Sequence, residues 1–94
     1  GSEMCIRDRF MAYKRLTKLI REKTQRKETI ETKVLNLYEA SNPSFYYVYE
    51  VLGDYYAAIQ QTDTAITYWQ KALTMPIPKQ AEKVRIQQKI NKNQ

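Results

Sequence analysis

Apolar residues recur at three- and four-residue steps along most of the chain, which is the period of an amphipathic helix. The pattern predicts five helices, at about residues 5–24, 28–40, 43–60, 63–75 and 78–91. The aromatic run that starts at Phe45 could be a strand, but it continues into the helical series Tyr49, Leu52, Tyr56 and Ile59. Short connections between successive helices favour antiparallel hairpins, so we expect an all-α fold of helical hairpins.

Residues suited to helix ends separate these segments. Asn42 is a candidate N-cap for the third helix, with Pro43 in its first turn, where a missing N–H is harmless. Thr62 is a candidate N-cap for the fourth helix, with Asp63 in its first turn. Pro76 ends that helix, because the residue before a proline avoids the helical conformation.

The apolar stripes also predict which side chains face the core. For the first helix these are Phe10, Tyr13, Leu16 or Met11, Leu19 and Ile20. For the second they are Ile30, Val34, Leu37 and Tyr38. On the last helix, Ile77, Ala81 and Val84 form a stripe suited to packing on the fourth helix, whereas Ile86 and Ile90 lie roughly opposite. This second stripe would remain free for another copy, so a homodimer is one expected assembly.

Residues 46–77 contain small and large side chains at fixed intervals. In chain order these are Tyr49, Leu52, Gly53, Tyr56, Ala65, Trp69 and Ala72. The series resembles the fingerprint of the tetratricopeptide repeat (TPR), a helical hairpin of about 34 residues. The resemblance implies that Gly53 and Ala65 let two antiparallel helices approach closely, while the larger side chains fill the seam around them. A glycine within a helix costs about 1 kcal/mol relative to alanine, so a packing reason is expected for Gly53.

The chain also departs from that family pattern. Gln60 replaces the usual glycine between the paired helices, and Pro76 and Pro78 flank the position of the closing proline. One repeat earlier the match is poor. We therefore expect a degenerate hairpin at 10–42, a TPR hairpin at 43–77 and a C-terminal capping helix at 78–94.

The first nine residues have a different character from the rest. Gly1-Ser2 resembles the scar of a removed expression tag, and residues 4–9 resemble a translated sequencing adapter. We therefore expect a C-terminal fragment of a longer bacterial protein of metagenomic origin. The compartment stays open, with the cytoplasm slightly favoured. No apolar run approaches the ~20 residues that a membrane-spanning helix needs.

Charge and composition limit the chemistry of the chain. Sixteen Lys and Arg residues against ten Asp and Glu give a net charge of +6, with both ends basic and the middle acidic. Histidine is absent and Cys5 is the only cysteine, which rules out an internal disulfide and a Cys/His zinc site. Neither a nucleophile–base pair nor a glycine-rich phosphate loop is recognisable. We therefore expect a protein that is not an enzyme and that holds no metal or cofactor.

Two groups of residues are candidate binding sites. In the TPR family the first helix of each hairpin lines a concave groove, and the resemblance projects Tyr47, Glu50, Val51, Asp54 and Ala58 onto it. If they are functional, Glu50 and Asp54 favour a basic or N–H-rich peptide; the alternative is a solvated face.

The second candidate is the basic stretch of the first helix, in which Lys14, Lys18 and Arg21 share one stripe. Binding of nucleic acid would also require an aromatic stacking row or a reading helix, so a solvated outer face is the simpler interpretation. The leading hypothesis is a TPR-like module that binds a protein or peptide. The alternatives are a basic nucleic-acid-binding accessory module and a non-catalytic tail of a bacterial acyltransferase-type enzyme, whose C-terminal extensions the segment 72–78 and the charged last helix resemble.

Overall fold

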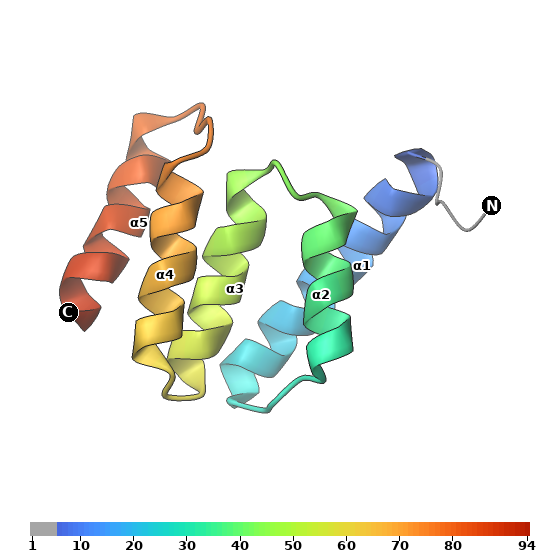
Figure 1. The fold of residues 1–94 in the computed structure, drawn as a ribbon, viewed down its shortest axis with the longest axis horizontal. Coiled ribbons are helices and arrows are strands. Elements are labelled where there is room, and N and C mark those ends of the chain that lie inside the picture. Colours follow the sequence, from blue (N-terminus) through green and yellow to red (C-terminus); the bar gives the residue numbers. More distant parts are fainter. Residues whose placement is uncertain (1–5) are drawn as a thin grey trace.

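The computed structural model describes residues 6–94, which form helices and no strand. The helices are α1 (Ile6–Arg26), α2 (Thr32–Ser41), α3 (Tyr46–Ala58), α4 (Thr62–Leu73) and α5 (Gln80–Asn93). Each overlaps one predicted segment, which confirms the all-α class. In Figure 1, α5, α4, α3 and α2 follow one another across the molecule and α1 crosses behind α2. The predicted tag scar at Gly1-Ser2, the first part of the adapter-like segment and Cys5 lie outside the described residues.

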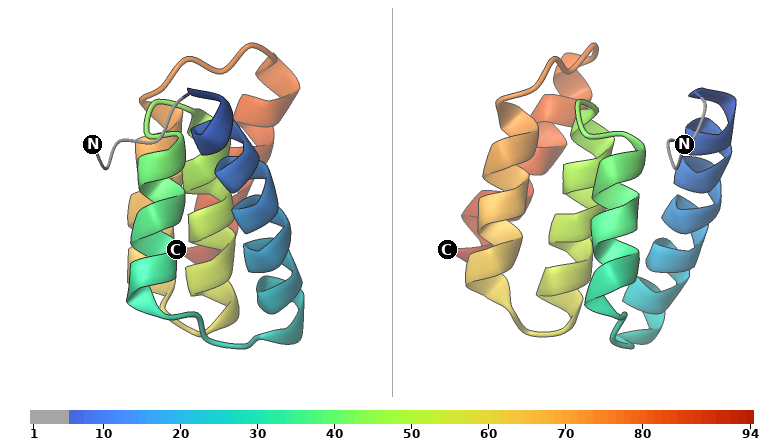
Figure 2. Two further views of the ribbon diagram at one scale, coloured as in Figure 1. Left: turned by 90° about the vertical axis from the view of Figure 1, so that its right-hand side faces the viewer. Right: turned by 45° about the vertical axis from the view of Figure 1, so that its right-hand side comes forward.

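The central helix of the fold is α3. It packs on α1, α2 and α4, while α5 packs on α4. Figure 2 shows α2 and α4 on one side of the molecule and α1 and α5 on the other. The buried residues of α3 are Tyr46, Val48, Tyr49, Glu50, Val51, Leu52, Gly53 and Tyr55. A helix that is apolar nearly all round requires neighbours on every side, which accounts for this position.

The turns after α1 and α3 have the same hydrogen-bond pattern. The N–H of Gln61 donates to the carbonyl of Tyr56 at 2.8 Å, and that of Gln60 donates to Ala57 at 3.2 Å. Gln60 has a φ of 70°, in the left-handed region. Lys27, with a φ of 57°, holds the equivalent position after α1. This pattern is the Schellman motif, whose left-handed residue is usually glycine.

The predicted N-caps are wrong. The helix α3 begins three residues after Pro43, because residues 42–45 form a turn in which the Phe45 N–H donates to the Asn42 carbonyl at 3.3 Å. Phe45 itself occupies the cap position. At α4 the cap position belongs to Gln61, and Thr62 is already the first helical residue.

The core-facing predictions are correct for only part of each helix. On α1, Ile20 is buried, and Tyr13 and Leu16 pack partly buried against the core. Against the prediction, Phe10, Met11 and Leu19 are exposed. On α2, Tyr38 is buried as predicted, but Leu35 takes the inward position predicted for Leu37.

The two faces of α5 are the reverse of the prediction. Ile86 and Ile90 are buried, whereas Ala81 and Val84 are exposed. The apolar stripe that would have joined two copies is therefore covered within the same chain. No free surface for a homodimer is present at Ile86 and Ile90.

The close contact between α3 and α4 is made by Gly53 and Trp69. A Cβ added to Gly53 would lie 2.9 Å from Cε2 of Trp69 and nearer still to Cδ1 and Nε1. Ala65, predicted to share this contact, is fully buried in the same core, and Trp69 is buried nearby as predicted. Gly53 is required because the indole ring occupies the space of a side chain.

Candidate ligand-binding site

The carboxylate of Glu50 is buried beneath two cations of α5. Glu50 is only 2 % exposed. Arg85 donates to both of its oxygens, from Nε at 2.8 Å and from Nη2 at 2.7 Å. Lys89 Nζ donates to Oε2 at 2.7 Å. Such a bidentate, charge-assisted contact fixes the side chain and compensates for the desolvation of the carboxylate.

Asp54 lies one turn further along α3 and shares a cation with Glu50. Lys89 Nζ donates to its two oxygens at 3.0 and 3.1 Å. The indole N–H of Trp69 donates to Oδ1 at 3.2 Å. The ring that covers Gly53 therefore also anchors Asp54, and the helix seam and the polar cluster form one unit.

The two carboxylates respond differently to this environment. Burial raises the pKa of Glu50, but hydrogen bonds from Arg85 and Lys89 and their charges outweigh it and hold that pKa below 4.5. For Asp54, burial dominates over the charge and hydrogen bond of Lys89, so its pKa is raised above 3.8. Both carboxylates are thus paired with cations of α5.

The sequence-based picture of an open acidic face is wrong. Glu50 is covered, and the basic, N–H-rich partner that the two carboxylates favour is α5 of the same chain. Val51 is buried, and Tyr47 and Ala58 are partly buried. The Tyr47 ring lies 6.4 Å from the ring of Phe45 and 6.3 Å from that of Tyr46, measured between centroids.

A cleft of about 190 Å³ opens between α1 and α3. Its lining consists of Arg21, Thr24, Gln25, Val51 and Asp54. Of the projected site residues, the structure thus brings Val51 and Asp54 to a common cleft and leaves Tyr47, Glu50 and Ala58 outside its lining. We call this feature the α1–α3 cleft.

Sequence reasoning found only part of this site: Arg21 was named in the basic stretch of the first helix, but Thr24 and Gln25 of α1 and Arg85 and Lys89 of α5 were not. Thr24 and Gln25 have no distinguishing pattern in the sequence. A signal for Arg85 and Lys89 was present, since they repeat on α5 the four-residue spacing of Glu50 and Asp54 on α3. Opposite charges at equal spacing on two helices can pair turn for turn.

The tyrosines serve mainly as packing. Tyr68 stacks on Tyr56 and Tyr49, with centroids 5.4 and 6.3 Å apart, and Lys71 Nζ lies 4.7 Å from the centroid of Tyr49. The hydroxyl of Tyr46, a buried residue, donates to Glu82 of α5 at 2.5 Å. These contacts join helices to one another.

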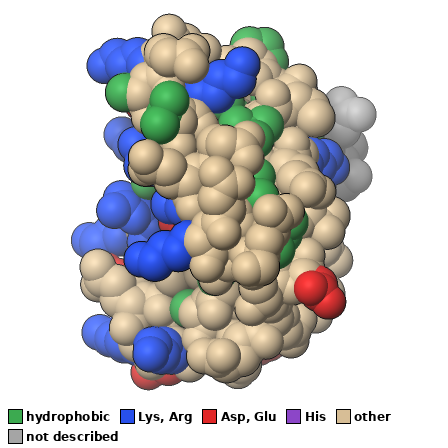
Figure 3. Space-filling view, turned by 90° about the vertical axis from the view of Figure 1, so that its left-hand side faces the viewer, with side chains coloured by type: hydrophobic (Ala, Val, Ile, Leu, Met, Phe, Trp, Pro, Cys, Tyr) green, Lys and Arg blue, Asp and Glu red, His purple; other side chains and the backbone are tan. Residues whose placement is uncertain are grey.

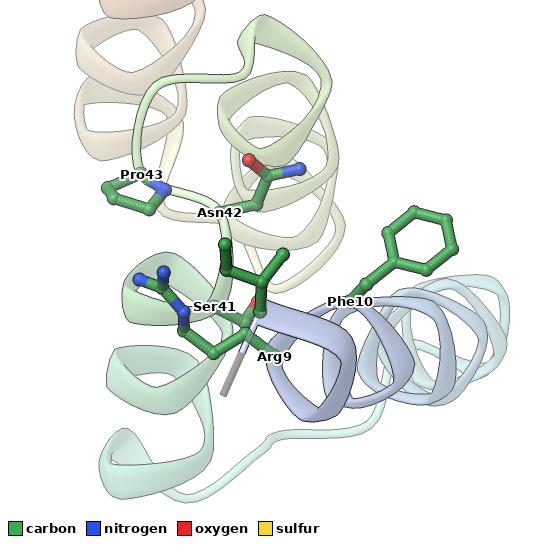
Figure 4. A pocket seen from close by; sticks show the side chains of 6 residues that line it. Arg9, Phe10, Ser41, Asn42 and Pro43 are labelled. Atoms are coloured by element: carbon green, nitrogen blue, oxygen red, sulfur yellow. The ribbon is translucent and has the colours of Figure 1, made fainter. Parts of the chain in front are cut away.

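A second cavity, of about 200 Å³, lies where the start of α1 meets the loop between α2 and α3 (Figure 4). Its lining is Ile6, Arg9, Phe10, Ser41, Asn42 and Pro43. The Phe10 ring points away from Pro43. Because Ile6 and Arg9 belong to the segment that resembles a translated adapter, we do not take this cavity as the candidate site.

Within residues 6–94 no cluster of three or more His, Cys, Asp and Glu side chains is arranged to hold a metal ion. No helix of that part is long and apolar enough to cross a membrane. Comparisons with protein-family models, with curated proteins and with solved structures found no match to this chain.

Proposed function

We propose that the chain is a TPR-like interaction module that binds a peptide segment of another protein on the side formed by α1, α3 and α5. The observation that carries this proposal is the α1–α3 cleft. Its lining combines the apolar side chain of Val51 with side chains that donate and side chains that accept hydrogen bonds. The resemblance of the α3–α4 hairpin to the TPR fingerprint supports it. The proposed role involves no catalysis, metal or cofactor.

The lining of the cleft suits a peptide backbone. Arg21 supplies N–H donors, Asp54 supplies acceptors, and the amide of Gln25 supplies both. A peptide in an extended conformation presents N–H and C=O groups in alternation, so it needs donors and acceptors from the same cleft. Val51 offers a small apolar contact between them.

Titration of isotope-labelled protein with a pool of unrelated short peptides would test this proposal by NMR. We expect shifts of the backbone amides of Thr24, Gln25 and Val51 by at least one peptide. Gln25→Ala should weaken that binding, whereas Gln70→Ala on the exposed face of α4 should not. If no peptide in the pool perturbs the cleft, or if the shifts gather on α2 and α4, the proposal is wrong.

A basic nucleic-acid-binding accessory module is the second candidate, favoured by the net charge of +6. Binding to phosphates releases counterions, so its affinity falls steeply as salt rises. A cleft that also makes apolar and hydrogen-bond contacts should be less sensitive. Binding of a duplex and of a selected peptide at two salt concentrations distinguishes the two functions.

A further inference from the structure

Two helices carry twelve of the sixteen Lys and Arg residues. Eight Lys and Arg residues against two Asp and Glu lie on α1, and four against one lie on α5. One of each sign lies on α2 and on α4, while α3 carries two carboxylates and no cation. Because α1 and α5 lie on the same side of the molecule, that side is strongly basic (Figure 2). In the view onto the α5 end, Lys and Arg side chains gather along the left edge (Figure 3).

Within this side, the cations form two rows. Lys14, Lys18 and Arg21 follow one another on α1 at steps of four and three residues, and so do Arg85, Lys89 and Lys92 on α5. Arg21 lines the α1–α3 cleft, so the first row borders that cleft. The second row borders α3 through the contacts of Arg85 and Lys89. We call the two rows together with the cleft the basic groove.

Only part of this charge is compensated. Arg85 and Lys89 are paired with Glu50 and Asp54. Lys18, Arg21 and Lys92 form no ion pair with any described residue. Lys14 lies 5.5 Å above the Phe10 ring, a contact that leaves its charge in place. The two carboxylates of α3 are thus already paired, whereas no ion pair with a described residue is formed by the row on α1.

We propose that the basic groove binds an acidic peptide segment, whose carboxylates pair with the row on α1. The inference rests on the proposed function and specifies its partner. The proposed partner is acidic, whereas Glu50 and Asp54 alone favour a basic one. The difference arises because cations of α5 neutralise both carboxylates. Asp and Glu side chains along an extended segment would supply the missing counter-charge, and this complementarity would also steer its association.

The cleft itself favours a peptide over a nucleic acid. The side chain of Asp54 is 37 % exposed there and, beside its contacts with Lys89 and Trp69, can accept a further hydrogen bond from a ligand. A peptide backbone has N–H donors, whereas a sugar–phosphate backbone of DNA has acceptors only. None of the residues that line the cleft is aromatic, so stacking on bases gains nothing there.

Fluorescence anisotropy with the full chain tests the inference. The probes are an end-capped peptide of alternating Glu and Ala, its Gln-for-Glu counterpart, and a single-stranded oligothymidylate with the same number of charges. The groove variant is Lys18→Glu with Arg21→Glu. Its control is Lys33→Glu with Lys83→Glu, which changes the net charge equally at exposed positions outside both rows. If the groove variant does not fold, the milder double variant Lys18→Gln with Arg21→Gln takes its place.

We expect the glutamate peptide to bind at least about tenfold more tightly than its glutamine counterpart. The groove variant should lose about tenfold or more in affinity, the milder variant less, and the control variant at most about threefold. Equal losses in the groove and control variants would overturn the groove assignment, and tighter binding of the oligothymidylate would favour a nucleic-acid partner. Equal binding of both peptides would refute the acidic partner but leave the peptide-binding function standing. If no peptide binds in this experiment or in the NMR pool, both the acidic partner and the peptide-binding function are refuted.

Discussion

Gly53 and Trp69 illustrate how one missing side chain determines a helix contact. Relative to glycine, alanine gains about 1 kcal/mol in a helix, so Gly53→Ala would stabilise an unconstrained α3. The indole of Trp69 is buried, rigid and hydrogen-bonded to Asp54, so it cannot yield to a Cβ. We expect Gly53→Ala to lower the free energy of unfolding by about 1–3 kcal/mol in chemical denaturation.

A second substitution identifies the cause. In a Trp69→Leu background, which is itself less stable, the added cost of Gly53→Ala should shrink, because the overlapping ring is gone. An increase in stability with Gly53→Ala alone would mean that the ring does not lie against the glycine.

Gln60 has a left-handed backbone conformation that residues with a side chain rarely adopt. Its φ of 70° is unfavourable for any side chain with a Cβ. The two Schellman hydrogen bonds hold it there. Gln60→Gly should therefore stabilise the protein by about 0.5–1 kcal/mol, since relief of strain exceeds the entropy that glycine adds to the unfolded state.

The adjacent residue is the matched control for this prediction. Gln61 has a φ of −105°, which suits a residue with a side chain, so Gln61→Gly should destabilise. Urea titrations of both variants decide the point. Equal effects of the two substitutions would contradict the left-handed assignment at Gln60.

At the scale of elements, α5 shows how an ambiguous helix selects its inner face. It has apolar residues on two sides, and the fold buries Ile86 and Ile90 rather than Val84. Ile86→Ala should cost about 2–4 kcal/mol, whereas Val84→Ala should change stability by less than about 0.5 kcal/mol. Thermal denaturation of the two variants compares the faces directly. A larger loss with Val84→Ala would restore the orientation expected from the sequence.

The attachment of α5 to α3 should depend on pH. The folded pKa of Glu50 lies below its ordinary value of 4.5, so its contribution is complete above that pH and is lost as the pH falls through the lowered folded pKa. The folded pKa of Asp54 is raised, so its contribution to stability is present at low pH and is lost as the pH rises through that folded pKa. We expect Glu50→Gln to lose about 1–3 kcal/mol at neutral pH.

Two comparisons test this assignment. The stability of Glu50→Gln should fall less than that of the parent between about pH 6 and pH 3, because the titrating group is gone. Glu39→Gln is the control, since its contact with Lys71 at 3.4 Å is partly exposed and worth less than about 0.5 kcal/mol. If the parent and Glu50→Gln have the same acid dependence, Glu50 is not the group responsible.

At the scale of the whole molecule, the periodicity of the sequence was sufficient to predict the helices, but not to predict where each helix starts or which of its faces is buried. The pattern that ran on from Phe45 correctly favoured a helix over a strand, because its apolar residues recur at helical steps. The start of α3 was missed because the backbone turn at Asn42 competes with a side-chain cap. The two sides of α5 are similarly apolar in sequence, and the choice between them is linked to the long-range pairing of Arg85 and Lys89 with α3.

The same limit applies to the candidate site. The spacing of Glu50 and Asp54 placed them on one side of α3, and this is where they lie. Their counter-charges come from residues 35 or more positions later in the chain, so no local pattern reveals that they are neutralised. The sign of a surface depends on such pairings, which is why the partner inferred from the fold is opposite in charge to the one expected from the sequence.

The beginning of α1 should contribute little to the stability of the whole. Residues 6–10 are exposed, Ile6 to 79 %, and the first side chain from this end that packs against the core is Tyr13. Deletion of residues 1–9 should therefore shift the Tm by no more than about 2 °C, because the side chains that it removes among the described residues are largely exposed. Tyr13→Ala in the full chain is the contrast, since it removes a ring stacked on Tyr38 at 5.8 Å and should cost about 1–3 kcal/mol. Scanning calorimetry of the deletion, the substitution and the parent separates the two contributions. A fall of more than about 5 °C on deletion would show that residues before Phe10 hold α1 in place, whatever their origin.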